Sequence, residues 1–254
     1  MSTCFEVYEK CVQAIQMGIL INKTSSTDKE FHFQNWVEQR LSECSFHFEK
    51  SGRNSYPDFT IVEHTDGYEV KGLAWPGRDR SFDTNSQVPS GYHNGRTVYY
   101  IFGRYPVDSK DSSQVGSSSK SYPVIDLIIC HGDFINHTRD YVHENKSVKG
   151  FGSYGDIMIR DRKMYVAPTP FHLAQGTAGV ITLIIPEDLH LSDNYKIVGH
   201  LVRKETEKLT IGYSFDLQTN VLTESTIDNP NKGLEHKFLA CRLINQPDNP
   251  VTIV

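Results

Sequence analysis

The sequence predicts an α/β domain in which a central mixed β-sheet is flanked by two N-terminal helices and extended by a β-rich C-terminal half. Helical periodicity appears in residues 3–17 and 28–43, and later segments alternate short apolar strands with turn residues. Residues 123–130, PVIDLIIC, are apolar enough to be buried on both faces of a sheet. These patterns together favour layers of helix and sheet around one core.

The two predicted helices carry apolar stripes at helical spacing. The first helix is expected to stop at Gly18, and its stripe consists of Phe5, Tyr8, Val12 and Ile15. The second helix begins at a capping box formed by Thr27 and Glu30, whose side chains can pair with backbone N–H groups at the helix start. Its buried stripe consists of Phe33, Trp36, Val37 and Leu41.

Length and composition fit a soluble globular protein of one large domain or two small ones. The 254 residues can bury a substantial core, and the chain has no internal repeat and no convincing boundary. We therefore expect one domain over residues 1–254, with a core at about 1–135 and a β-rich part at about 136–254. Further strands are expected at 97–102, 179–185, 196–203, 209–216 and near 237–244, with a hairpin at 156–159 and 164–166 and a flexible Ser-rich loop at 108–121.

Charge and cysteine usage point to a cytoplasmic protein. The net charge of −5 gives no global sign of nucleic-acid binding, although DNA enzymes can confine positive charge to a cleft. No apolar run approaches the roughly 20 residues of a membrane helix, and the N-terminus lacks the pattern of a signal peptide. Five scattered Cys without C-x-x-C spacing indicate reduced thiols, and we expect no membrane partner.

The stretch YPDFTIVEHTDGYEVKGL, residues 56–73, predicts a β-hairpin. We expect its strands at 59–62 and 68–71, with Asp66-Gly67 as the turn, because Asp-Gly between two apolar runs is a strong hairpin signal. The rest of the chain is expected to be organised around this hairpin.

The hairpin brings two carboxylates and one amine together. Asp58 stands at the open end of the first strand, while Glu69 and Lys71 leave the second strand on one face because side chains alternate. Asp58 with Glu69-Val70-Lys71 resembles the PD-(D/E)XK motif of type II restriction endonucleases and their relatives. Four other acidic-x-Lys triplets occur, at 108–110, 144–146, 161–163 and 235–237. Only the triplet in the hairpin follows a Pro-Asp across an intervening strand and turn.

The resemblance implies a restriction endonuclease-like core and Mg²⁺-dependent hydrolysis of phosphodiesters. Asp58 and Glu69 are then the metal ligands, since Mg²⁺ prefers hard oxygen donors. Lys71 is expected near the attacking water, where it lowers the pKa of the water or contacts the scissile phosphate.

Members of this superfamily often place an acidic residue or Gln on the helix before the hairpin. Residues 33–41, FQNWVEQRL, fit that pattern with Gln34 in the polar position, so Gln34 is expected to orient a metal-bound water. Glu30 and Glu38 are the alternatives. The capping box explains Glu30, and a solvent-facing helix surface explains Glu38.

Residues 72–96 are predicted to form a long, ordered and functional loop, because they lack a hydrophobic period and follow the candidate catalytic strand. Their polar side chains suit base edges, Arg for guanine and Asn or Gln for adenine. The expected DNA contacts are Arg78, Arg80, Asn85, Ser86, Gln87, His93, Asn94 and Arg96. Arg104 is a further phosphate-contact candidate, and a hydrogen-bonded structural loop is the alternative for the whole segment.

By resemblance, the expected function is sequence-specific cleavage of double-stranded DNA by a prokaryotic type II restriction endonuclease. Palindromic cutting implies a homodimer with two-fold symmetry. The same core supports junction resolvases and repair nucleases, so these stay open. A third possibility is a non-catalytic β-rich binding protein in which Glu69 and Lys71 form a surface ion pair. The sequence does not specify the recognition site, the cleavage position, the oligomeric state or the role of residues 136–254.

Overall fold

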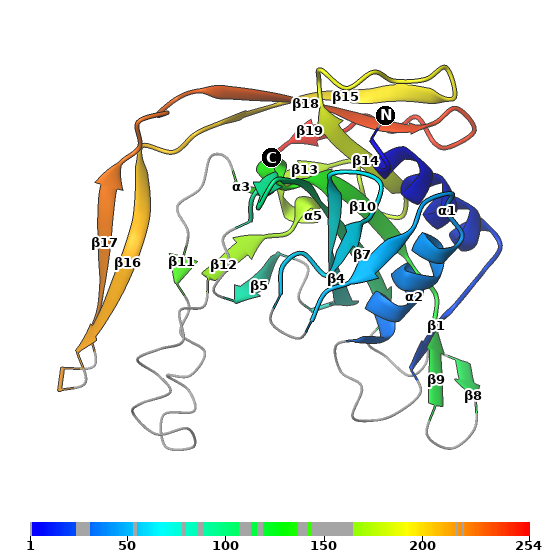
Figure 1. Ribbon diagram of the computed structural model, residues 1–254, viewed down its shortest axis with the longest axis horizontal. Coiled ribbons are helices and arrows are strands. Elements are labelled where there is room, and N and C mark those ends of the chain that lie inside the picture. The colour runs from blue at the N-terminus through cyan, green and yellow to red at the C-terminus, as the bar shows by residue number, and fades with distance from the viewer. Residues whose placement is uncertain are drawn as a thin grey trace.

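The two amphipathic helices and most of the expected strands form in the computed structural model (Figure 1). The structure describes residues 2–23, 31–52, 55–77, 80–85, 89–106, 113–115, 119–136, 142–143, 165–216, 218–219 and 221–254. The helices are α1 (Cys4–Gln16), α2 (Phe31–Ser42), α3 (Gly132–Asn136) and α5 (Pro170–Leu173). The strands are β1 (Ile21–Lys23), β2 (Phe48–Lys50), β3 (Phe59–Ile61), β4 (Asp66–Trp75), β5 (Ser81–Asn85), β6 (Tyr92–His93), β7 (Arg96–Pro106), β8 (Ser113–Val115), β9 (Ser119–Tyr122), β10 (Asp126–His131), β11 (Val142–His143), β12 (Tyr165–Pro168), β13 (Ala174–Gln175), β14 (Ile181–Pro186), β15 (Tyr195–Lys204), β16 (Lys208–Asp216), β17 (Val221–Asp228), β18 (Glu235–Leu243) and β19 (Thr252–Ile253).

A nine-stranded mixed sheet is the centre of the fold. Its strand order is β15-β18-β14-β10-β7-β4-β3-β2, with β6 paired to β7. β4 and β7 are parallel, as are β10 and β14, and the other neighbours are antiparallel. The predicted mixed sheet flanked by helices is therefore confirmed, and strands β14, β15 and β18 extend it with C-terminal residues as expected.

Helices α1 and α2 cover one face of the sheet (Figure 1). Phe33 of α2 lies directly over Gly72 of β4 and Gly103 of β7, which are partners in register. A Cβ on Gly72 would lie 2.8 Å from the Phe33 Cβ, and one on Gly103 would lie 2.2 Å from the Phe33 Cζ. The two glycines thus make room for the helix. Residues Tyr68 and Val70 alternate with Gly72 and pack into the same helix-side core.

The opposite face of the sheet carries a second core. It is formed around Leu73 of β4 and Phe102 of β7, which pack with Phe82 of β5, Phe134 of α3 and Ala167 of β12. This face is therefore lined by elements from the middle of the chain instead of the N-terminal helices. Alternation along β4 directs Glu69 and Lys71 to this second face, because Tyr68 and Val70 point toward the helices.

The predicted turn of the hairpin is wrong, although its two strands pair as expected. Asp66 and Gly67 open β4, and the chain reverses across residues 62–65. The Asp66 Oδ2 atom accepts hydrogen bonds from the Thr3 N–H at 2.6 Å and the Thr3 hydroxyl at 2.8 Å, so it holds the start of α1. Gly67 is needed because a Cβ there would lie 2.6 Å from the Pro57 Cγ. The positions of Asp66 and Gly67 are therefore determined by tertiary contacts and not by a local turn.

Two expected loops contain strands. The segment 72–96 holds the end of β4 and all of β5 and β6, and the Ser-rich segment 108–121 holds β8 and most of β9, which pairs with β1. The expectation of irregular structure is wrong for these strands. β5 and β9 pair with β12 and β1, which are far away in sequence, whereas β6 and β8 form hairpins with the adjacent β7 and β9. The hairpin expected at 156–159 and 164–166 falls mostly outside the described residues. Of its second strand, residues 165 and 166 are described, and they begin β12.

The hairpin of β15 and β18 continues beyond a bend as the ribbon of β16 and β17, which projects from the rest of the molecule (Figure 1). At the bend, the buried Asn229 amide donates to the Glu205 Oε2 at 2.9 Å and to the Thr206 carbonyl at 3.0 Å. His236 Nε2 lies 2.9 Å from the Glu205 Oε1. These contacts hold the bend in one geometry.

None of the described helices is long and apolar enough to cross a membrane.

Candidate active site

Asp58 and Glu69 are cross-strand neighbours. Phe59 pairs with Tyr68, so the next step of the antiparallel register sets Asp58 opposite Glu69. The Asp58 N–H donates to the Glu69 Oε2 at 3.2 Å, and the Val70 N–H donates to the Asp58 Oδ2 at 2.8 Å. The hairpin therefore brings the two carboxylates side by side.

Lys71 completes the group on the same face of β4. Its Nζ lies 2.6 Å from the Glu69 Oε1. Glu69 is buried, whereas the Lys71 side chain keeps 21% of its surface exposed. The ammonium group is thus held against one carboxylate and still reaches solvent, which leaves it accessible to a ligand on this face.

The two carboxylates lie close together in a partly desolvated environment, which disfavours the ionised form of Asp58. Burial, followed by the neighbouring Glu69 charge, raises the pKa of Asp58 from its usual 3.8 to about 6. The hydrogen bond from Val70 and the Lys71 ammonium act in the opposite direction. A cation placed between Asp58 and Glu69 would relieve this repulsion, so the electrostatics favour metal binding at high pH.

The donor set fits Mg²⁺. The ion commonly uses one or two carboxylates, while waters and substrate phosphates complete its octahedron. Asp58 and Glu69 supply two carboxylates at adjacent positions. Among the described residues, no group of three or more His, Cys, Asp and Glu side chains could hold a metal ion, so a fully protein-enclosed site is not what this part of the chain offers.

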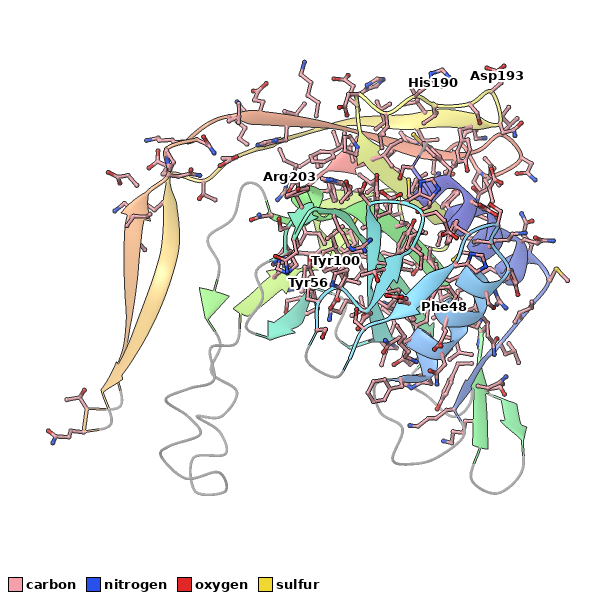
Figure 2. All side chains as sticks on the ribbon, viewed as in Figure 1. Phe48, Tyr56, Tyr100, His190, Asp193 and Arg203 are labelled. Atoms are coloured by element: carbon pink, nitrogen blue, oxygen red, sulfur yellow. The ribbon has the colours of Figure 1, made fainter. Side chains whose placement is uncertain are left out.

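Two tyrosines lie next to the carboxylates and were missed in the sequence. Tyr56 and Tyr100 have hydroxyl oxygens 2.9 Å apart, and they lie together on the ribbon in Figure 2. Tyr100 is the partner of Glu69 in the β4–β7 register, and the His93 ring centroid is 4.9 Å from that of Tyr56. Burial raises the pKa of Tyr56, and the Glu69 charge acts in the same direction, so Tyr56 stays a neutral hydroxyl. The only sequence signal was the position of Tyr56 just before Pro57-Asp58.

Among the described residues, no hydrogen bond or ion pair joins Gln34 to this group. Gln34 follows Phe33 on α2, and α2 packs on the face of β4 opposite to Glu69 and Lys71. Its alternative Glu38 is one helical turn away and pairs with Lys50 at 2.5 Å. The other alternative, Glu30, and its capping partner Thr27 lie outside the described residues.

Three of the predicted DNA contacts have roles within the fold. Arg96 donates to the Ile61 carbonyl at 2.9 Å and to the His64 carbonyl at 3.1 Å, so it ties β7 to the turn after β3. Asn94 has a φ of 49° and forms the turn between β6 and β7. The side chain of Arg104 is buried against Asp126, with its Nε 2.7 Å from the Asp126 Oδ1. Two of the five N–H donors of Arg104 are therefore committed to the Asp126 carboxylate.

The remaining predicted contacts divide into two groups. Arg80 is exposed at the start of β5, His93 is half-buried beside Tyr56, and Asn85 ends β5. These three are on the strands next to the carboxylates or on the segment that leads away from β4. Arg78, Ser86 and Gln87 lie outside the described residues.

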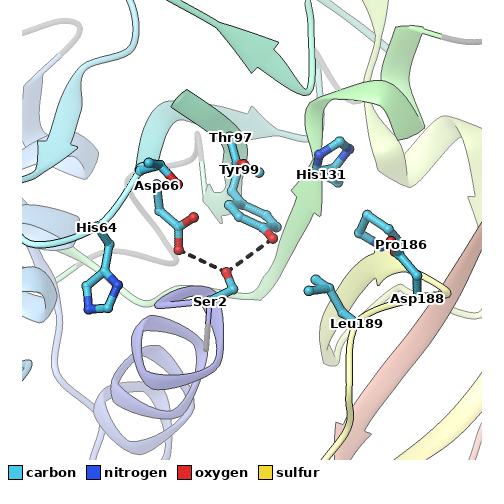
Figure 3. A pocket seen from close by; sticks show the side chains of 10 residues that line it. Ser2, His64, Asp66, Thr97, Tyr99, His131, Pro186, Asp188 and Leu189 are labelled. Atoms are coloured by element: carbon cyan, nitrogen blue, oxygen red, sulfur yellow. Dashed lines mark hydrogen bonds between the residues drawn. The ribbon is translucent and has the colours of Figure 1, made fainter. Parts of the chain in front are cut away.

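A cavity of about 540 Å³ lies elsewhere, at the amino-terminal ends of β4 and β7 (Figure 3). Ser2, Asp66, Tyr99, His131 and Asp188 are among the residues that line it. The Ser2 hydroxyl bridges the Asp66 Oδ2 at 2.9 Å and the Tyr99 hydroxyl at 3.2 Å. These groups mainly satisfy one another. The carboxylates of Asp58 and Glu69 and the ammonium group of Lys71 do not line this cavity.

Comparison of the chain with models of known protein families, with curated proteins and with solved structures finds no match. The site is therefore interpreted from its own geometry.

Proposed function

We propose that the protein is a Mg²⁺-dependent endonuclease that hydrolyses phosphodiesters of double-stranded DNA. The observation that carries this proposal is the cross-strand pair of Asp58 and Glu69 with the Lys71 ammonium 2.6 Å from one of its carboxylate oxygens. Two carboxylates and a cation on one face of the sheet match the needs of metal-assisted hydrolysis.

Each residue has a separate task in this reaction. Asp58 and Glu69 hold the metal, which supplies a more acidic bound water and neutralises charge on the phosphate. Lys71 orients the attacking water and stabilises the negative charge that grows on the phosphoryl oxygens. As the bond from water to phosphorus forms, the bond to the leaving oxygen breaks. The attacking water loses a proton to solvent, and the leaving alkoxide takes up a proton from solvent. Tyr56, whose hydroxyl donates to the Ser90 carbonyl at 3.3 Å and shares a hydrogen bond with Tyr100, lies beside the carboxylates without adding charge.

The finer features of the proposal follow the motif resemblance. They are a PD-(D/E)XK nuclease core, site-specific cutting as part of a prokaryotic cytoplasmic restriction–modification system, and a two-fold homodimer on palindromic DNA. The exposed Arg80 and the half-buried His93 are the described residues that we propose for DNA contact. Junction resolution and repair of mismatched DNA are the alternative activities of the same chemistry.

The proposal is tested by incubating the purified protein with phage and plasmid DNA, with Mg²⁺ or Mn²⁺ and with a chelator. We expect discrete fragments with either metal and none with the chelator. Cleavage of only branched or mismatched substrates would favour junction resolution or repair over restriction activity. Intact DNA of every type with both metals would refute nuclease activity.

The raised pKa of Asp58 predicts that protons compete with the metal. Below the pKa of about 6 the carboxyl is protonated, so at subsaturating Mg²⁺ we expect the cleavage rate to fall about tenfold for each pH unit. Added Mg²⁺ should recover the rate and shift the midpoint to lower pH. The measurement is the initial rate from pH 5 to 8 at two Mg²⁺ concentrations. A pH profile that is the same at both concentrations would contradict the competition.

A further inference from the structure

Trp75 presents an exposed aromatic face at the end of the candidate catalytic strand. It is 39% exposed, whereas Trp36, the only other tryptophan, is 2% exposed. Trp75 is the last residue of β4, four positions beyond Lys71. Because alternate residues share a face, Trp75 lies on the same side of the sheet as Lys71, about 13 Å along the strand.

The other side of the Trp75 ring is held from within the protein. The Arg104 guanidinium carbon lies 5.5 Å from the Trp75 ring centroid and 4.4 Å from that of Phe171. Arg104 itself is fixed by Asp126, whose Oδ2 also accepts a hydrogen bond from the Gly179 N–H at 2.8 Å. The Arg104 guanidinium is thus held between two aromatic rings and is not directed toward solvent. This clamp positions Trp75 before any ligand arrives.

The backbone of the exposed Arg80 contacts the segment that carries Phe171. The Thr169 N–H donates to the Arg80 carbonyl at 3.0 Å, and Thr169 caps the short helix α5 that carries Phe171. Arg80 is exposed, so its guanidinium can reach a phosphate near the rings. An aromatic surface with an adjacent exposed arginine matches the pairing of base stacking and phosphate attraction that proteins use for unpaired nucleic acid.

We propose that Trp75 is a stacking platform for an unpaired or extruded nucleobase of the bound DNA strand. This inference rests on the proposed function, because that function places DNA on this face of β4. A paired base within a duplex already has neighbours on both faces, so the ligand must be a base that has left the stack. At about 3.4 Å per base step, the platform lies about four steps of B-form DNA from Lys71.

A hydrophobic protein partner is a weaker explanation of the exposed ring. Such a partner would favour further apolar surface around Trp75, whereas the neighbouring Pro76 and Gly77 are small and Arg80 is charged. The exposed ring together with the exposed charge of Arg80 favours a ligand that combines one flat apolar face with negative charge. A nucleotide has both.

The test uses the full chain with Lys71→Met, so that DNA cleavage is suppressed. The probe is an oligothymidylate of twelve nucleotides. Trp36 is buried, so a change in tryptophan fluorescence on binding reports Trp75. We expect quenching by the oligonucleotide and weaker quenching by the same backbone with abasic sites. Trp75→Leu should weaken binding about tenfold or more, and Trp75→Phe should recover part of the loss. Unchanged Trp36 emission and circular dichroism serve as the folding control.

Three outcomes distinguish this inference from the proposed function. Equal binding of the oligonucleotide and its abasic form, or equal affinity of the wild type and Trp75→Leu, would overturn the platform. If wild-type protein then still cut DNA, the nuclease proposal would stand alone. Quenching by the oligonucleotide without any cleavage by the wild type would support the platform and refute the nuclease.

Discussion

Lys71→Met is expected to lower DNA cleavage at least about 100-fold without unfolding the protein. Methionine keeps most of the side-chain volume but removes the ammonium that stands 2.6 Å from the Glu69 Oε1. A group that stabilises transition-state charge in a low-dielectric site contributes roughly two to three orders of magnitude to the rate. The measurement is the single-turnover cleavage rate at saturating Mg²⁺ together with the thermal unfolding midpoint.

Lys204→Met is the matched control for this variant. Lys204 ends β15, at the opposite edge of the sheet from the hairpin, where it pairs with the exposed Glu235 at 3.0 Å. We expect its cleavage rate to stay within about threefold of the wild type, because an exposed ion pair contributes little. Equal losses in both lysine variants would mean that general electrostatics, and not Lys71 at the site, support the reaction.

Asp58→Asn separates a catalytic role from a structural one. Because the folded state raises the pKa of Asp58 to about 6, ionising this carboxyl destabilises the fold as pH rises through that value. At pH 8 without metal, the neutral amide should therefore stabilise the protein by about 1–3 kcal/mol while cleavage is lost. Loss of both activity and stability would indicate a structural carboxylate.

The hairpin could be predicted because alternation and apolar content are local signals. Asp58, Glu69 and Lys71 are placed by two strands that pair within 14 residues, so the sequence held the information. The turn was misplaced because Asp66 and Gly67 are fixed by Thr3 and Pro57, contacts that no local pattern reports. The local sequence predicts a turn at Asp66-Gly67, whereas tertiary contacts place both residues at the start of β4.

The arginines illustrate the same limit. Arg96 and Arg104 carry donors that suit DNA, but their carbonyl and carboxylate partners are 22 to 35 residues away in sequence. Composition identifies a donor and cannot tell whether the protein itself satisfies it. Similarly, Gln34 occupied the expected place in a helix pattern, yet which face of the sheet α2 covers depends on the packing of Phe33 against Gly72 and Gly103.

Asp126→Ala is expected to destabilise the protein by about 3–5 kcal/mol, because it leaves the Arg104 guanidinium buried without its carboxylate. Asp126 is completely buried and Arg104 is 8% exposed, so water cannot replace the lost partner easily. The Gly179 N–H would also lose its acceptor. Urea or thermal unfolding measures the effect. Glu235→Ala, which breaks the exposed pair with Lys204 at 3.0 Å, is the control and should change stability by less than about 1 kcal/mol.

The double variant Arg104→Met with Asp126→Leu completes the argument about Arg104. Replacing both partners by apolar groups removes the buried charge as well as its counterion, so most of the lost stability should return. If Arg104 only supports the fold, DNA binding by this variant should keep the salt dependence of the wild type, since no phosphate contact is lost. A slope of log affinity against log salt that falls by about one unit would show that Arg104 neutralises a phosphate after all. In that case the buried pair with Asp126 would have to open when DNA binds.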